Sequence, residues 1–172
     1  MKHIILLTLL VTFGYSNIQE RHNTTKNIDV HTYVKKTIMT PSVHLARYKA
    51  RRSNKVVAKI DISQQRMRVY RGNKLIYNWK VSTGKKGHNT PTGHYKPKSM
   101  EKMHYSRKYN NAPMPYSVFF RGGYAVHGTR SVSRLGRRAS HGCVRLRTSN
   151  AKKLYSLIRK VGRHNSSIKI VH

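Results

Sequence analysis

The sequence predicts a mainly β domain with one C-terminal helix and a short final strand, and three observations support this prediction. Short β-branched and aromatic runs follow one another from residue 55 onward, and apolar residues at helical spacing come near the C-terminus. The chain has 172 residues, 37% of them hydrophobic, which suffices for one modest core and a tail. We therefore place a single folded domain at residues 55–172.

The first part of this domain is predicted to be an antiparallel meander. Polar turns, SQQ and RGNK, separate three runs of strand-forming residues. The runs are Val57 with Ile60–Ile62, then Met67, Val69 and Tyr70, and then Leu75–Tyr77, Trp79 and Val81. A proline-interrupted loop follows, and two further strands are predicted around the Gly122-Gly123 turn. They are Tyr116–Phe120 and Tyr124–Gly128.

The C-terminal part predicts one helix and one strand. Apolar residues recur at helical spacing at Ala151, Leu154, Leu157, Ile158 and Val161. We expect the helix cap at Thr148–Asn150 and the stop at Gly162. The IKIV run at 168–171 is the expected final strand.

The N-terminus has the layout of a secretory signal. Lys2 precedes an apolar run at Ile4–Phe13, and small residues follow, so we expect residues 1–16 to be a signal peptide. A buried helix or a membrane anchor is the alternative, but this ten-residue run spans about half a bilayer. Residues 17–54 are predicted to be a basic, flexible tether, unless they add a strand or helix to the domain. The chain is then exported to the periplasm or cell wall, and we expect a monomer without a membrane span once the signal is removed.

The charge of the chain predicts polyanionic surroundings. Lysine and arginine number 36 against 4 acidic residues, which gives a net charge of +32. Nucleic acid, phosphorylated lipid and acidic wall polymers all fit such a charge. Because export keeps the protein from chromosomal DNA, we expect anionic wall or outer-surface polymers as partners and no nucleic acid in vivo.

Cys143 is the single cysteine, so the chain forms no internal disulfide. Such a thiol is a pairing handle, a reactive group or a small buried residue. Cationic groups and a neighbouring histidine lower the pKa of a thiol, which favours the reactive role. His127 and His141 are the candidate bases. Four arginines flank the thiol: Arg137, Arg138, Arg145 and Arg147.

Two features near Cys143 concern the shape of a catalytic site. Gly142 permits a tight turn and a close approach of substrate to backbone N–H groups, as an oxyanion site requires. His127 ends an apolar strand, and no acidic residue follows Glu101 in the chain. A carboxylate-supported triad is therefore disfavoured. A backbone carbonyl, with that of Gly128 as the best candidate, is expected to orient His127.

At this point the chain is identified as similar to a known family. The run HGTRSVSRLGRRASHGCVRL at 127–146 resembles the active-site signature of the L,D-transpeptidase catalytic domain, the YkuD family. IDISQQRMRVY and VSTGKKGHNTPTGHY resemble the opening strands and Thr-Pro-x-Gly loop of that family, and MPYSVFF resembles its substrate-side segment. The resemblance covers about residues 56–172. It implies an L,D-transpeptidase-like β-sandwich.

The resemblance also implies an activity and the roles of several residues. The enzyme attacks peptidoglycan stem peptides between an L-centre and a terminal D-residue, forms a thioester on Cys143, and passes the acyl group to an amine or to water. His127 matches the general base. Ser140, His141 and Gly142 match the segment that shapes the oxyanion site, with the Cys143 N–H as donor. Carbapenems are expected to acylate Cys143 and to form a thioester that hydrolyses slowly.

On the substrate side, the resemblance is less complete. Arg145 is expected to bind a stem carboxylate through paired hydrogen bonds. Met114 and Tyr116 lie in the substrate-side segment and are expected to contact substrate. Arg130 stands where family members often have asparagine after HGT. The resemblance implies no cofactor and no metal.

Two rival hypotheses remain open. His127, His141 and Cys143 could bind zinc, although a fourth ligand is missing and a cationic site repels the ion. A cationic protein that coats anionic wall or lipid phosphate, with an inactive or secondary catalytic core, would explain the excess charge. The sequence also leaves the acyl acceptor open between a second stem, a protein lysine, a D-amino acid and water.

Overall fold

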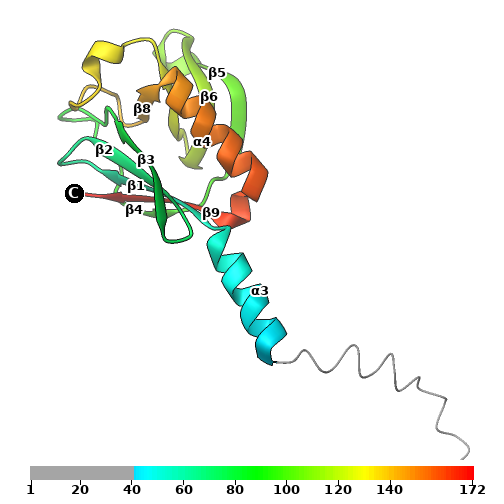
Figure 1. Cartoon of the computed structure of the whole chain (residues 1–172). Helices are drawn as coiled ribbons and strands as arrows, with labels where there is room; N and C mark the ends of the chain where they lie inside the picture. The colour runs from blue at the N-terminus through cyan, green and yellow to red at the C-terminus, as the bar shows by residue number, and fades with distance from the viewer. Residues whose placement is uncertain (1–40) are drawn as a thin grey trace, which may run out of the picture. The chain divides into compact units, whose positions relative to one another are not determined.

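The computed structural model describes residues 41–172. The expected signal peptide and residues 17–40 of the expected tether lie outside these residues. Within the tether, Pro41–Ser53 form helix α3 (Figure 1), so its described part is helical. Proline is favoured in the first turn of a helix, and Pro41 is the sequence signal that marks this start. Among the described residues, no helix has the length and apolar character needed to cross a membrane.

The first sheet contains the predicted meander. Its strands are β1 (Val56–Asp61), β2 (Arg66–Arg71), β3 (Lys74–Lys80), β4 (Gly93–Tyr95) and β9 (Ser166–Val171), in the order β3-β2-β1-β9-β4. β1, β2 and β3 pair antiparallel, which confirms the meander. The final strand β9 is confirmed as well, and it pairs parallel with β1 and antiparallel with β4.

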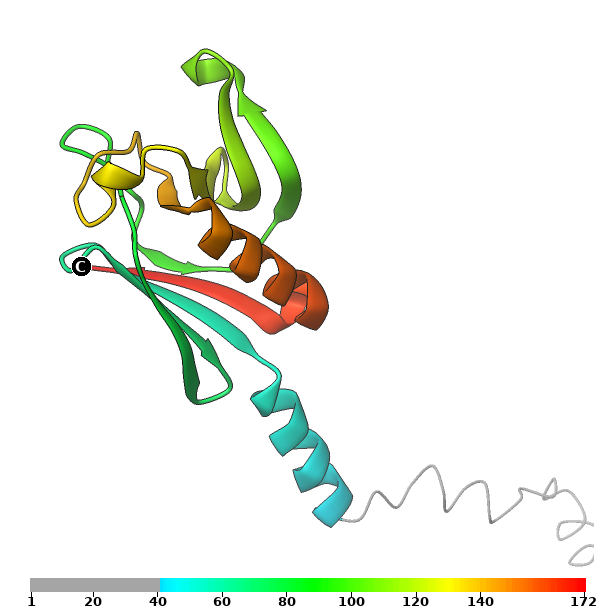
Figure 2. The same ribbon diagram turned by 45° about the horizontal axis from the view of Figure 1, so that its top comes forward.

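The second sheet carries two predicted strands and two others. Its order is β5-β6-β7-β8, and its strands are β5 (Ser99–Ser106), β6 (Ala112–Arg121), β7 (Tyr124–Thr129) and β8 (Val144–Arg147). β6 and β7 confirm the predicted pair around Gly122-Gly123. β5 lies in the segment that was expected to be a loop. The sequence contains no signal of this strand because its apolar residues Met103 and Tyr105 are exposed, so no buried apolar face can be recognised. Figure 2 shows the β5–β6 hairpin extending beyond the rest of the domain, with the 3₁₀ turn η1 (Arg107–Tyr109) at its tip.

Helix α4 (Thr148–Val161) packs against β6, β7, β8 and β1. Thr148–Asn150 form its first turn, which corrects the cap expected there, and Arg147 occupies the N-cap position without a capping side-chain bond. Gly162 ends the helix as predicted, with a φ of 89° and its N–H donating to the Ile158 carbonyl. The buried face of α4 is formed by Ala151, Leu154 and Ile158.

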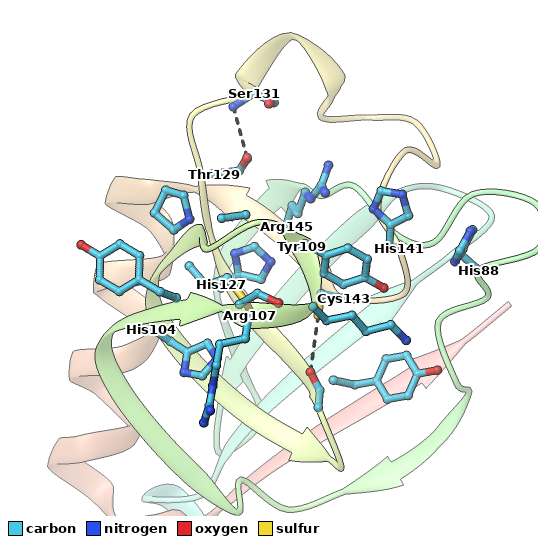
Figure 3. Close-up of a pocket in the computed structure, with 18 of the residues that line it drawn as sticks. His88, His104, Arg107, Tyr109, His127, Thr129, Ser131, His141, Cys143 and Arg145 are labelled. Carbon is cyan, nitrogen blue, oxygen red and sulfur yellow. Dashed lines mark hydrogen bonds between the residues drawn. The ribbon is translucent and has the colours of Figure 1, made fainter.

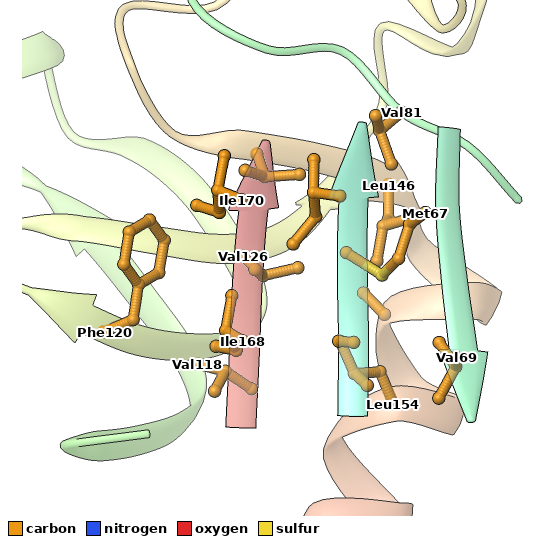
Figure 4. Close-up of a cluster of buried hydrophobic side chains, with 14 of the residues drawn as sticks. Met67, Val69, Val81, Val118, Phe120, Val126, Leu146, Leu154, Ile168 and Ile170 are labelled. Atoms are coloured by element: carbon orange, nitrogen blue, oxygen red, sulfur yellow. The ribbon is translucent and has the colours of Figure 1, made fainter. Parts of the chain in front are cut away.

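The two sheets enclose one main hydrophobic core. Val118, Phe120, Val126 and Leu146 of the second sheet belong to the same buried cluster as Met67, Val69, Ile168 and Ile170 of the first and Leu154 of α4 (Figure 4). Burial of this apolar surface is the main force that holds the sheets together. The prediction of a mainly β fold with one C-terminal helix and a final strand is confirmed.

Candidate active site

The alternation of side chains along β7 and β8 places the candidate residues on one face of the second sheet. Val126, Val144 and Leu146 are buried in the main core. Successive side chains of a strand point to opposite faces, so His127 and Arg145, which are paired in register, share the other face. Cys143 directly precedes β8 and lies two positions from Arg145, on that same face. Figure 3 shows the three side chains around one pocket.

His127 is held by the backbone carbonyl that the sequence predicted. Its Nδ1 lies 2.8 Å from the Gly128 oxygen, and the side chain is buried. A carbonyl oxygen only accepts hydrogen bonds, so the neutral ring carries its proton on Nδ1 and leaves Nε2 as an acceptor. Burial lowers the pKa of His127 to about 4; the bond to Gly128 opposes this shift, and the charges of Arg145 and His104 add to it. Near neutral pH, His127 is therefore an uncharged base.

The Cys143 thiol does not have the lowered pKa that the flanking arginines predicted. Burial raises its pKa, and a backbone hydrogen bond from Ala125 and the Arg145 charge offset only part of this effect. The thiol donates to the Gly123 carbonyl at 3.8 Å. The resting site thus contains a neutral thiol and a neutral imidazole.

Burial outweighs the Arg145 charge, and two of the other flanking arginines make hydrogen bonds away from the thiol. Arg138 donates to the Gly84 carbonyl at 2.7 Å and to the Asn89 side chain at 2.7 Å, and Arg137 donates to the Ser133 carbonyl. Arg145 acts on the thiol, and its Nη1 also donates to the Ala139 carbonyl at 3.3 Å.

The turn before Cys143 requires glycine and is fixed by hydroxyl groups. Gly142 has a φ of +110°, and a Cβ there would lie 2.5 Å from the Tyr124 ring. Ser140 Oγ donates to the Cys143 carbonyl at 2.5 Å and accepts from the Gly142 N–H at 3.1 Å. Thr90 Oγ1 donates to the Gly142 carbonyl at 2.8 Å. The turn is therefore set by specific hydrogen bonds before any substrate arrives.

Further hydrogen bonds, which the sequence did not predict, hold the residues just before this turn. The Thr83 carbonyl accepts from the backbone N–H groups of Ala139 and Ser140 at 2.9 Å each. Thr83 is itself held by buried Gln65, which donates to Thr83 Oγ1 at 2.6 Å and accepts from the Thr83 N–H at 2.9 Å. The sequence could not predict these bonds, because Gln65 and Thr83 lie 18 positions apart and nothing in the local sequence indicates that they meet.

The thiol and imidazole open into a cavity of about 1130 Å³. Its wall comes from four segments: the 87–89 loop, residues 104–114 of β5, η1 and β6, the 119–131 region of β6 and β7, and residues 141–145. No aspartate or glutamate is among the described side chains that line it, whereas several cations are. These cations are Arg107, Lys108, Arg130 and Arg145. The cavity thus favours an anionic occupant.

The structure brings most of the predicted site residues to this cavity. Met114 lines it and belongs to a small apolar cluster with Phe119 and Ala125 that Cys143 packs against. His141 also lines it; its ring stacks on Tyr109 with centroids 4.8 Å apart.

Three predicted residues lie behind the cavity wall, and one lies elsewhere. Ser140, Gly142 and Gly128 are buried. Tyr116 is not among the lining residues, and its ring packs edge-on against Tyr155 of α4 at 5.8 Å. The expected substrate contact through the Tyr116 side chain therefore has no support in the geometry, because this side chain packs against the helix.

The cavity also contains residues that the sequence did not single out. His104 lines it, accepts or donates one hydrogen bond with Glu101 at 2.8 Å, and packs edge-on against Phe119. Tyr105 and Tyr109 join it from β5 and η1, the region expected to be a loop. A further ring, His88, meets His141 edge-on at 4.8 Å. In the described part of the chain, no three histidine, cysteine or acidic side chains are grouped as metal ligands, so the zinc hypothesis lacks a ligand set.

Fold and site together define a two-sheet domain with a cysteine and a carbonyl-held histidine in a cationic cavity. Residues 55–166 match the family model of the L,D-transpeptidase catalytic domain (YkuD), and the chain belongs to this family.

Solved structures with the same fold agree with this assignment. They include an L,D-transpeptidase from Mycobacterium smegmatis, with a TM-score of 0.61, 23% identity, and coverage of 69% of this chain and 59% of that one. An L,D-transpeptidase from Stackebrandtia nassauensis has a TM-score of 0.60, 28% identity, and coverage of 69% and 56%. An LD transpeptidase in complex with imipenem has a TM-score of 0.60, 25% identity, and coverage of 67% and 58%.

This chain therefore spans between 56% and 59% of the length of these three structures. The comparison with curated protein sequences gave no match.

Proposed function

We propose that this chain is an exported L,D-transpeptidase that acts on peptidoglycan stem peptides through a thioester on Cys143. The observation that supports it most is the hydrogen bond from His127 Nδ1 to the Gly128 carbonyl. This bond leaves Nε2 unprotonated on the face of the sheet that also presents the thiol, which is the arrangement a general base needs.

The first half-reaction transfers the thiol proton and forms the thioester. His127 Nε2 takes the proton of Cys143 as Sγ attacks the stem carbonyl carbon, and the Cys143 N–H stabilises the oxyanion. The intermediate collapses when His127 gives its proton to the departing amine of the terminal D-residue. Because burial disfavours both charged forms, we expect the proton to move together with the attack rather than beforehand.

The second half-reaction regenerates the thiol. An acceptor amine attacks the thioester carbonyl, His127 takes a proton from that amine, and Cys143 leaves and is reprotonated. Water in place of the amine gives L,D-carboxypeptidase side activity. The cationic lining supports binding of a stem that carries carboxylates, and half-buried Arg145 is the proposed partner of one of them.

The charge supports a second, anionic partner, which we propose to be a wall or outer-surface polymer. The outward face of the first sheet carries a row of basic side chains, here called the cation row: Arg68 of β2, Lys59 of β1, Lys169 of β9 and His94 of β4. Register places each directly opposite the next. Within the described residues, the one ion pair joins His104 to Glu101, so no carboxylate makes an ion pair with this row, although the charges of Arg68 and Lys59 act on Asp61 at longer range. A polyanion would supply the missing counter-charge.

Export rests on the sequence of residues 1–16, and the proposed location is the periplasm or cell wall. The rival hypothesis, a cationic binding protein with an inactive core, shares the partner but not the thioester. The two are separated by the chemistry of Cys143.

The test is to incubate the mature protein with a carbapenem and measure its intact mass. We expect one adduct, on the peptide that contains ASHGCVR, because Cys143 is the only cysteine. The Cys143→Ala variant, shown by circular dichroism to be folded, should gain none. A folded wild-type protein without an adduct, or with the adduct on serine or lysine, would overturn the transpeptidase proposal and favour the binding protein.

A further inference from the structure

We propose that Thr90 is a positioning residue that aims the backbone N–H of Cys143 at the oxygen of the acyl group. This inference rests on the proposed function, since the N–H acts as oxyanion donor only if Cys143 is acylated. Thr90 is not among the residues that line the cavity of the thiol, and its side-chain hydrogen bonds go to Gly142 and Gly84. It acts through the peptide group between Gly142 and Cys143.

The side chain of Thr90 makes two hydrogen bonds in a buried position. Its Oγ1 donates to the Gly142 carbonyl at 2.8 Å and accepts from the Gly84 N–H at 2.8 Å, and Thr90 is 4% exposed. With its acceptor role filled by Gly84, the hydroxyl proton is directed to Gly142. The bond crosses 52 positions of sequence and joins the Thr-Pro-x-Gly loop to the nucleophile turn.

Peptide geometry converts this bond into control of the oxyanion donor. The described chain contains no cis peptide bond, so the Gly142 carbonyl and the Cys143 N–H belong to one planar trans group and point in opposite directions. The carbonyl points to buried Thr90. The N–H therefore points away from Thr90, and rotation of this peptide plane would redirect it.

Neighbouring peptide planes are fixed by a different hydroxyl. Ser140 Oγ accepts from the Gly142 N–H, which fixes the plane before, and donates to the Cys143 carbonyl, which fixes the plane after. Thr90 holds the plane between them. Gly142 has a φ that side-chain-bearing residues rarely adopt, so the turn has no intrinsic preference for this orientation and depends on such bonds.

The loop that presents Thr90 is itself tightly folded. A Cβ on Gly84 would lie 1.8 Å from the His88 carbonyl oxygen and 2.8 Å from the Thr90 nitrogen. Arg138 adds a bond from the nucleophile side, to the Gly84 carbonyl. Thr90 is thus held at a defined place against the turn, as a residue that must orient a peptide group requires.

The experiment compares two reactions of the same thiol in the mature protein. Acylation by imipenem passes through an oxyanion, whereas alkylation by iodoacetamide does not. We expect Thr90→Val, which keeps the shape and removes the hydroxyl, to slow acylation by up to about 10²-fold to 10³-fold, the effect of losing an oxyanion donor outright. Alkylation should change less than twofold. Thr90→Ser should restore most of the acylation rate.

Thr92→Val is the matched control, since it removes a hydroxyl from the same loop without touching the turn, and both of its rates should stay near wild type. Equal losses of acylation and alkylation in Thr90→Val, or no loss of acylation, would overturn the inference. If Thr90→Val does not fold, Thr90→Ala is measured under the same criteria. A wild-type protein that forms no adduct would overturn the proposed function, whereas a normal wild-type adduct with an unchanged Thr90→Val rate would overturn this inference alone.

Discussion

The outward faces of the two sheets differ in how they treat polar groups. On the second sheet, His127 and the Cys143 turn are held by directed bonds to single atoms: the Gly128 carbonyl, Ser140 Oγ and Thr90 Oγ1. On the first sheet, the cation row places Arg68, Lys59 and Lys169 opposite one another, and none of the three forms an ion pair with a described carboxylate. The first arrangement determines geometry, and the second produces a long-range field.

If both proposals hold, the two faces serve separate steps. The half-buried thiol and the buried imidazole act over hydrogen-bond distances, where salt has little influence. The partly exposed charges of the cation row would attract the proposed polymer over several ångströms, and salt screens such attraction beyond about 8 Å at physiological ionic strength. Changes on the second sheet should therefore alter the chemical step, and changes in the cation row should alter binding to the polymer.

The largest expected effect comes from His127→Gln, on the second sheet. The variant should lose about 10²-fold to 10⁴-fold in turnover of a soluble stem peptide, because the thiol has no base. In the wild type, activity that depends on neutral His127 should fall as the pH drops through about 4. Steady-state rates between pH 4 and 8 test both points. Turnover within tenfold of wild type would move the base role to another group, with His141 as the next candidate.

The same variant should also change the pH dependence of stability. The pKa of folded His127, about 4, lies below its ordinary value of 6.5, so the folded state binds fewer protons between these values. Stability from neutral His127 is then complete above pH 6.5 and is lost as the pH falls towards 4, by about 3 kcal/mol in total. Urea unfolding at pH 4.5 and 7 should show a weaker pH dependence in His127→Gln than in wild type. An unchanged dependence would contradict the burial effect on His127.

A smaller effect is expected from neutralising the cation row. The triple variant Lys59→Gln, Arg68→Gln and Lys169→Gln should bind sacculi about tenfold more weakly at low salt. The slope of log affinity against log salt should fall by about 2 to 3, since each lost contact releases about one counterion fewer. Turnover of a soluble stem peptide should stay near wild type, because these side chains lie on the other sheet.

Three exposed cations of α4 provide the matched control: Lys152→Gln, Arg159→Gln and Lys160→Gln. This variant loses the same net charge as the triple variant of the cation row. It should retain most sacculus binding if the row is the docking surface. Equal losses in the two variants would show that total charge, and not the row, determines binding.

Much of the fold could be predicted because its signals are local. β1, β2 and β3 are short runs rich in β-branched and aromatic residues with polar turns between them, and α4 repeats apolar residues at helical spacing, so each pattern lies within one segment of the sequence. β4 has three residues and β8 has four, too few for such a pattern. β5 exposes Met103 and Tyr105, which reverses the pattern of a half-buried strand.

The sequence indicated which residue types form the candidate site, but not the burial and contacts of their side chains. The absence of acidic residues after Glu101 correctly indicated a carbonyl partner for His127. The raised pKa of Cys143 could not be foreseen, because it depends on burial between segments distant in sequence. Tyr116 illustrates the same limit, since its packing against Tyr155 is a tertiary contact. Contacts such as that of Thr90 with Gly142 require the folded chain.

The smallest expected effect is a gain of stability in the single variant Lys59→Gln. Lys59 lies between Arg68 and Lys169, and like charges directly opposite on neighbouring strands are destabilising by about 0.2–1 kcal/mol. Glutamine keeps most of the aliphatic stem and removes the charge. Asp61 limits the gain, because its carboxyl, whose pKa is lowered mainly by bonds from Ser63 and Gln64, is also stabilised by Lys59. We therefore expect a few tenths of a kcal/mol.

Urea unfolding in low salt and in about 1 M salt tests this, since screening over about 3 Å at 1 M should remove most of the gain. Lys152→Gln, on α4, should show no comparable salt-dependent gain. A loss of stability in Lys59→Gln at low salt would mean that neighbouring groups already compensate the row. A gain combined with weaker sacculus binding would mean that Lys59 favours the polymer at the expense of the fold.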